Sequence, residues 1–365
     1  MGTWDLITND QMTESRPNPP RPYPPHPGGR LRAYWQFLVA VIYFFLARSL
    51  AFRAATRMAG NQWFPLVEQA FLAALLLLGY AALGFWLNRQ IDPITEQGLP
   101  RRPGLFGEVG LGLATGWGLA VVSVLLMAVG GGIAVSISTR ASAWAWLLVE
   151  AAFFALAALA EEIVFRGYGF QRFAVSVGPV GASLGYAAFY AIIQSLLPGS
   201  TRASFMVSVA LGLLLSAAYL RTKAIWLSWG LNFGWKASRA LLFGLAISGV
   251  NSHSPVVQGN PMGPFWLTGG GFGLEGSWVT LLLLIAALPL VFRITRDLDY
   301  RYNAPVIIPA GIPVDLDAAA RAQHEAAMGS AEPAPPALIQ IGPATPPAPF
   351  TPPERPAPDR PSDSH

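Results

Sequence analysis

The sequence predicts an all-α fold, a multi-pass transmembrane helical bundle of about eight spans between proline-rich disordered tails. Hydrophobic residues make up 53% of the 365 residues and charged residues only 12%, whereas soluble domains are typically about 25% charged. The mean hydropathy is +0.43. Long apolar stretches recur, most of them near the roughly 20 residues that a bilayer-spanning helix needs. We therefore expect an integral membrane protein whose first partner is the lipid bilayer.

The predicted membrane domain covers residues 31–300. Its apolar stretches lie near residues 33–52, 64–87, 109–137, 142–165, 179–197, 203–220, 224–247 and 276–293. The first of them is not a cleavable signal peptide, because it is long enough to span the membrane. Arg48 lies close to its end, where a long cationic side chain can reach the membrane interface.

The two ends of the chain have a different composition. Residues 1–30 contain seven prolines between Pro17 and Pro27, which favour extended polyproline conformation over helix. Residues 301–365 are rich in proline and alanine, with one stretch near residues 316–328 that is compatible with a short helix. We expect both segments to be disordered tails.

The distribution of basic residues predicts the orientation in the membrane. Fourteen Lys and Arg residues lie in the N-terminal tail, in alternate loops and after the last stretch, and five lie at the opposite ends of the spans. Cytoplasmic loops carry an excess of Lys and Arg. An even number of spans with this bias predicts a multi-pass protein of the cell membrane with both termini in the cytoplasm.

Several classes of function are disfavoured by composition. The chain has no cysteine, which excludes disulfides and thiolate chemistry. None of its four histidines falls within a predicted span, so we expect no bound metal and no cofactor. The basic residues are scattered and form no stripe, so the formal charge of +4 does not indicate a nucleic-acid partner.

Two adjacent carboxylates, Glu161 and Glu162, end the apolar run 151–160. Ionisable residues at membrane depth are costly and are by default functional candidates. On a helix Glu162 and Arg166 are spaced i,i+4 and can pair, which leaves Glu161 without that partner and free for chemistry. A carboxylate in apolar surroundings suits a general base that activates water. The alternative is a Glu-Arg clamp that only fixes helix packing.

The E-E-x-x-x-R pattern resembles the first motif of the CPBP family, which comprises the CAAX proteases and the bacteriocin-processing enzymes also called Abi. In that family an F-x-x-x-H motif and an H-x-x-x-N motif follow on later membrane helices. Their counterparts here are Tyr190-Ala-Ile-Ile-Gln194 and Asn232-Phe-Gly-Trp-Lys236, and both histidines are replaced. The Gly-rich stretch 267–277 also resembles the segment before the last span of bacterial members. The likeness covers about residues 140–295.

The resemblance implies roles for individual residues. Glu161 stands where the family's water-activating base stands, with Glu162 and Arg166 in support. Gln194 replaces the histidine that helps to activate the water. A glutamine can hold a water by hydrogen bonds, but it cannot take up and return its proton as imidazole does.

The third motif is altered at both of its positions. Asn232 and Lys236 occupy the places of the pair that stabilises the oxyanion. Both side chains can donate hydrogen bonds, so an oxyanion site is chemically conceivable. The other interpretation is that Gln194, Asn232 and Lys236 have become a structural cluster across the helices, in which Lys236 pairs with Glu161 or Glu162.

Three function classes therefore stay open. The first is a glutamate-dependent intramembrane endopeptidase that cleaves lipidated or membrane-anchored peptides, impaired by the loss of its histidines. The second is an inactive pseudoprotease that acts as a membrane binding or scaffold protein. The third is a transporter, since charges inside the membrane also mark ion paths, although no internal repeat supports it.

The relative depth of Glu161 and Gln194 in the membrane does not follow from the sequence. If the fifth span starts at Pro179, Gln194 lies about 22 Å deep at about 1.5 Å per residue, while Glu161 lies near the inner end of its span. They meet only if the helices tilt, if the fourth span extends inward to about Arg172, or if the fifth begins deep.

The G-x-x-x-G at residues 112–116 predicts close helix packing. Glu150, three turns before Glu161, either extends a polar cavity or reaches water at the outer interface.

Overall fold

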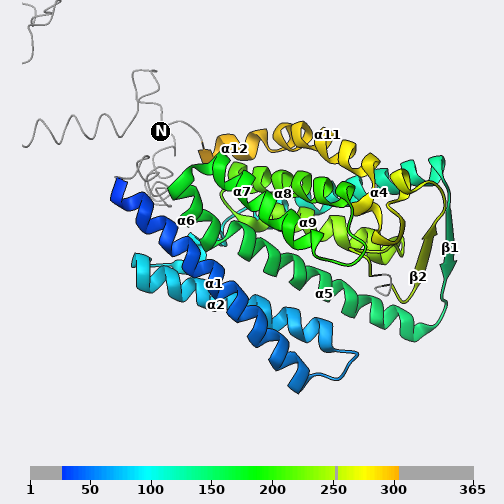
Figure 1. Ribbon diagram of the computed structural model, residues 1–365, viewed down its shortest axis with the longest axis horizontal. Helices are drawn as coiled ribbons and strands as arrows, with labels where there is room; N and C mark the ends of the chain where they lie inside the picture. Colours follow the sequence, from blue (N-terminus) through cyan, green and yellow to red (C-terminus); the bar gives the residue numbers. More distant parts are fainter. Residues whose placement is uncertain (1–26, 251–253, 304–365) are drawn as a thin grey trace, which may run out of the picture. The chain divides into compact units, whose positions relative to one another are not determined.

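The computed structural model describes residues 27–250 and 254–303 (Figure 1). Helices dominate this part of the chain. Its longer helices are α1 (Pro27–Met58), α2 (Phe64–Asn88), α4 (Leu105–Gly130), α5 (Ala141–Arg166), α7 (Pro179–Ser195), α8 (Arg202–Thr222), α9 (Ile225–Ala237) and α11 (Trp278–Ile294). Shorter elements are α3 (Pro93–Glu96), α6 (Tyr168–Val177), α10 (Phe265–Thr268), α12 (Arg296–Asn303) and the strands β1 (Ile133–Ile137) and β2 (Val257–Pro261). The all-helical membrane class predicted from the sequence is confirmed.

Each predicted apolar stretch contains a helix, but not every helix has the length of a membrane span. Among the described residues, five segments are long and apolar enough to cross a membrane: Gly29–Met58, Phe64–Asn88, Leu105–Gly130, Ala141–Val177 and Arg202–Thr222. Helix α11 is a shorter apolar helix of 17 residues, α7 also has 17 residues and α9 only 13. The predicted count of eight spans is therefore not reproduced by helix length.

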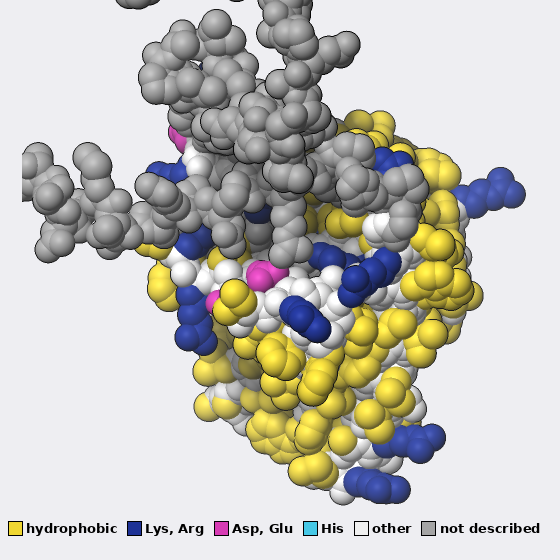
Figure 2. Space-filling view, turned by 90° about the vertical axis from the view of Figure 1, so that its left-hand side faces the viewer, with side chains coloured by type: hydrophobic (Ala, Val, Ile, Leu, Met, Phe, Trp, Pro, Cys, Tyr) yellow, Lys and Arg dark blue, Asp and Glu magenta, His cyan; other side chains and the backbone are white. Residues whose placement is uncertain are grey.

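The helices run alternately up and down between two ends of the bundle. Hydrogen bonds at one end join segments far apart in sequence: Trp226 Nε1 to the Pro100 carbonyl, Gln171 Nε2 to the Glu96 carbonyl, and Tyr302 Oη to Glu108. The start of α1 and helix α12 lie at this same end (Figure 1). Figure 2 shows this end, where Lys and Arg side chains gather among apolar ones. We call it the basic end.

The described boundaries differ from the predicted domain limits at both ends. Helix α1 begins at Pro27, before the predicted start at residue 31, and α12 reaches Asn303. Residues 1–26 and 304–365, with the short helix predicted near residues 316–328, lie outside the described residues.

Two predicted spans end earlier than expected. Helix α4 stops at Gly130, before the glycines Gly131 and Gly132, and the chain then forms β1, which pairs antiparallel with β2. Gly132 has φ +89°, a conformation that glycine adopts at little cost. Helix α9 gives way after Ala237 to a π-helical turn, Ser238–Leu242. Periodicity and hydropathy gave no sign of either change.

Candidate functional site

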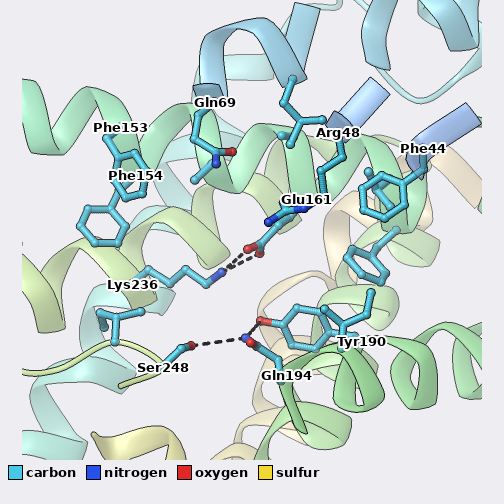
Figure 3. A pocket seen from close by; sticks show the side chains of 17 residues that line it. Phe44, Arg48, Gln69, Phe153, Phe154, Glu161, Tyr190, Gln194, Lys236 and Ser248 are labelled. Carbon is cyan, nitrogen blue, oxygen red and sulfur yellow. Dashed lines mark hydrogen bonds and ion pairs between the residues drawn. The ribbon is translucent and has the colours of Figure 1, made fainter. Parts of the chain in front are cut away.

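A cavity of about 240 Å³ lies between α1, α2, α5, α7 and α9 (Figure 3). Aromatic side chains form much of its wall, and a few polar groups converge at one side. Its polar residues are Arg48, Gln69, Glu161, Tyr190, Gln194, Lys236 and Ser248. A mostly apolar cavity with a few convergent polar groups is the usual form of a small-ligand or active site.

Glu161 extends from the last turns of α5 into this cavity, where two donors of α9 hold its carboxylate. Lys236 Nζ lies 2.5 Å from Oε1 and 2.6 Å from Oε2. Asn232 Nδ2 donates to Oε2 over 3.0 Å. The expectation of a Glu161 free for chemistry therefore does not match this geometry. Both of its oxygens face donors, because Lys236 and Asn232 project from successive turns of one helix face.

Glu162 points away from the cavity into the protein. Its Oε1 accepts from Arg166 at 3.2 Å and from Asn232 Nδ2 at 3.2 Å, and the residue is fully buried. Arg166 also donates to the carbonyl of Gly212 on α8 at 2.9 Å. The i,i+4 pair thus ties α5 to α8 and α9, which is the geometry of a structural clamp.

Gln194 lies on the last turn of α7 and lines the same cavity. Its Nε2 donates to Tyr190 Oη over 3.1 Å and to Ser248 Oγ over 3.5 Å. Glu161 stands seventeen residues before Gly178 and Gln194 sixteen residues after it. Helix α6 continues the fourth segment past Arg172 before the chain turns at Gly178, so the two arms have nearly equal lengths and both residues line one cavity. This agrees with the extension of the fourth segment that was one of the three expected solutions.

Glycines fix the position of α9 against α4. A Cβ at Gly112 or Gly116 would lie 2.2 Å from the carbonyl oxygen of Leu227 or Leu231. Reciprocally, a Cβ at Gly230 or Gly234 of α9 would lie 2.4 Å and 2.6 Å from carbonyl oxygens of α4. The G-x-x-x-G of residues 112–116 therefore serves close helix packing, as expected. Gly230 and Gly234 of α9 have the same spacing and form a second, matching G-x-x-x-G.

A second polar cluster adjoins the cavity beyond Lys236. Arg239, in the π-helical turn, lies 2.8 Å from Glu275 Oε1, and its guanidinium lies over the Trp235 ring at 4.0 Å. Ser248 donates from Oγ to Glu275 Oε2 over 2.7 Å. Burial raises the pKa of Glu275, but the charges of Arg239 and Lys236 and the hydrogen bonds outweigh it, so its pKa lies below the ordinary value. The cluster links the Gly-rich segment to Gln194 through Ser248.

Some lining residues were not selected from the sequence. Arg48, predicted to reach the membrane interface, is exposed and also lines the cavity from α1 (Figure 3), and within the described residues its side chain has no hydrogen bond or ion pair. Gln69 comes from α2, and Ser248 from a loop whose approach no local pattern indicates. Tyr190 could be identified from the sequence as the first residue of the second motif. Glu150 does not line the cavity.

This arrangement limits the chemistry that the cavity can perform. An ammonium and an amide nitrogen donate hydrogen bonds but cannot accept a proton. Gln194, which also lines the cavity, has no titratable proton to exchange. Among the described residues, no three His, Cys, Asp or Glu side chains come together as a metal site would require. The site is well formed to hold polar groups of a ligand and poorly formed to move protons.

Residues 141–238 match the family model described as type II CAAX prenyl endopeptidase Rce1-like. The match runs from the start of α5 to the turn after α9, so it includes all six site residues selected from the sequence. No curated protein and no solved structure matches the chain. Over residues 141–238 the chain is thus similar to the CAAX prenyl endopeptidases, which belong to the CPBP family that its motifs resemble.

Proposed function

We propose that this chain is a CAAX-type membrane domain that binds lipidated or membrane-anchored peptides without cleaving them efficiently. The observation that carries the proposal is the Lys236 ammonium, 2.5 Å and 2.6 Å from the two oxygens of Glu161. A general base must reach the proton of its water within about 2.6–3.2 Å. In this protein Lys236 and Asn232 occupy that space, and Gln194 replaces the partner that would relay the proton.

The cavity itself supports a binding role. It keeps a volume of about 240 Å³ and an aromatic wall that includes Phe44, Phe153 and Phe154. A site that had merely decayed would be expected to close, since interiors pack to high density. An apolar cavity with one polar side suits a peptide that carries a lipid or an apolar side chain.

The deciding experiment restores the family's side chains. Purified protein in proteoliposomes is given a farnesylated or membrane-anchored reporter peptide. We expect little or no cleavage by the wild type, and a gain of about 10²- to 10⁴-fold from the triple change Gln194→His, Asn232→His and Lys236→Asn, the range typical of acid-base catalysis. Glu161→Gln in that background should abolish the gain, while Glu150→Gln on the same helix should not.

Two results would decide against the proposal. Strong wild-type cleavage that disappears with Glu161→Gln would establish an active protease with an amide-amide-ammonium site. A reporter carrying a photoreactive group should crosslink to the wild type, and Ala157→Trp, which fills the cavity, should remove the crosslink. Equal crosslinking in both proteins would place binding elsewhere.

We also propose that the basic end faces the cytoplasm, from the bias of Lys and Arg residues toward one set of loops. Since α1 begins and α12 ends at this end, both termini would be cytoplasmic. Reporter fusions after Arg301 should then be active only as cytoplasmic reporters. An extracytoplasmic signal would reverse the assignment.

A further inference from the structure

Lys223, at the turn between α8 and α9, is an exposed cation that the fold itself does not use. Within the described residues its side chain has no hydrogen bond or ion pair. Arg221, two residues earlier, is fully engaged: it lies 2.9 Å from Asp299 and donates to Thr295 and to the Phe292 carbonyl. Asp299 is thereby bonded to Arg221, and it acts on Lys223 only as a nearby charge, without an ion pair between the two.

The backbone of Lys223 also departs from what the position favours. It caps the C-terminus of α8 with φ 53° and ψ 24°, the left-handed region in which this capping position is usually glycine. Residues with a side chain adopt this region at a cost, and an observed outlier is grounds for a functional hypothesis. A lysine held there is more costly than a glycine, and in the described part of the chain its side chain makes no hydrogen bond or ion pair that would offset the cost.

Two cavities flank this lysine and share it. One, of about 470 Å³, lies beside α6 and is lined by Arg172, Lys223 and apolar side chains such as Phe170 and Val175. The other, of about 410 Å³, runs between α7, α8 and α11, with walls that include Leu184, Leu213, Ala217, Leu288 and Phe292. Leu220 and Lys223 belong to both. The second cavity also contains the Arg221–Asp299 ion pair. Together the two cavities form an apolar groove with three cations, Arg172, Arg221 and Lys223, and one carboxylate near the residues that they share.

We propose that this groove binds one anionic phospholipid, with the phosphate on Lys223 and Arg172 and the acyl chains along α7, α8 and α11. Three observations select a lipid over a soluble anion. The walls are apolar, the helices that form them belong to a membrane domain, and Lys223 precedes Trp226 at the basic end, where cations gather (Figure 2). Basic pockets between membrane helices characteristically hold anionic head groups. This site is separate from the cavity of Glu161, so the inference does not depend on the proposed function.

The test measures thermal stability in a neutral detergent with added lipid, and lipid retention by native mass spectrometry. A ligand present at about 100 times its Kd stabilises the fold that binds it, so phosphatidylglycerol should raise the Tm of the wild type by about 5 °C or more. Phosphatidylcholine should raise it much less. Glycerol phosphate, which carries the head-group charge without acyl chains, should have no effect.

Lys223→Gly is the informative variant, because it removes the charge and relieves the left-handed backbone. Without lipid its Tm should equal or exceed that of the wild type, while the response to phosphatidylglycerol should be lost. Ala217→Phe, which fills the apolar part of the groove, should also reduce the response. Arg202→Gln removes an exposed cation at the other end of the same helix and should leave it unchanged.

Three outcomes would overturn the proposal. An equal response to phosphatidylcholine would remove the role of charge, and a response to glycerol phosphate alone would indicate a soluble anion site. A response to phosphatidylglycerol that persists in Lys223→Gly would show that the lipid binds elsewhere.

Discussion

Two ion pairs lie near the C-terminal end of α9, one on the helix and one on the π-helical turn that follows it, and they differ in their exposure to water. Lys236 pairs with Glu161, and these side chains are 7% and 29% exposed, so water in the cavity reaches the carboxylate. Arg239 pairs with Glu275, and these side chains are 0% and 4% exposed. When one member of a pair is removed, the other must either be hydrated or stay buried without a partner, and the second case is far more costly. The open pair can therefore be exchanged in evolution or by mutation, whereas the sealed pair is tied to the fold.

The same contrast bears on the family's chemistry. The open pair lies at positions where the family resemblance implies catalytic roles, and the sealed pair lies just beyond the last motif. A substitution at Lys236 changes which group faces the cavity without dismantling its wall. The family's side chain can therefore be restored at Lys236 without loss of the fold, whereas a substitution at Arg239 would disrupt the fold.

The largest expected effect is that of breaking the sealed pair. Arg239→Met should leave Glu275 buried without its main partner, and removing one member of a buried pair typically costs about 3–5 kcal/mol. Unfolding in mixed detergent micelles measures this free energy. The double variant Arg239→Met, Glu275→Leu should recover part of the loss, because no buried charge remains. A single variant as stable as the wild type would contradict the comparison.

The second effect tests the support that α4 gives to the helix carrying both pairs. Gly116→Ala would place a Cβ 2.2 Å from the Leu231 carbonyl oxygen, and such overpacking typically costs about 1–3 kcal/mol. Gly118→Ala on the same helix meets nothing within 4 Å. It should be neutral or stabilising by up to about 1 kcal/mol, because alanine favours helix. Equal losses in both variants, in the same unfolding assay, would mean that the glycine contacts do not position α9.

A smaller effect is expected for the open pair. Lys236→Met should cost only about 1 kcal/mol, near the upper end for pairs that water can reach. Mass spectrometry after carbodiimide labelling should find Glu161 modified more in this variant than in the wild type, and Lys236→Arg should restore protection. A loss of stability as large as that of Arg239→Met would show that the cavity is effectively dry.

The smallest effect concerns metal. The ligands around Glu161 are amides and an ammonium, which bind Zn²⁺ weakly or not at all. Elemental analysis of the purified wild type should give well under one zinc per chain, and incubation with a chelator should not change its Tm. A stoichiometric zinc that is lost with Glu161→Ala would refute this prediction.

The helical membrane fold and the resemblance to the CPBP family could be predicted from the sequence, because hydropathy and the E-E-x-x-x-R motif are local signals. It also anticipated, as one alternative, that Lys236 would meet Glu161 or Glu162. It missed the π-helical turn, the β1–β2 ribbon and the Arg239–Glu275 pair. These depend on contacts between segments far apart in sequence, such as Arg239 with the Gly-rich stretch, and no periodicity records them. The contribution of Arg48 to the cavity was not anticipated, because its position along a span does not reveal which face of the helix carries it.

The turn at Gly178 has a consequence for how this chain can change in length. Glu161 and Gln194 stand seventeen and sixteen residues from it on opposite arms. Removing one residue from either arm would shift that arm by about 1.5 Å and rotate it by about 100°, which would turn one of the two side chains out of the cavity. A matched removal of one residue from each arm would restore equal lengths but not the rotation, so insertions and deletions between residues 162 and 193 should be poorly tolerated even in pairs. Both arms must keep their length and their helical phase for Glu161 and Gln194 to line the same cavity.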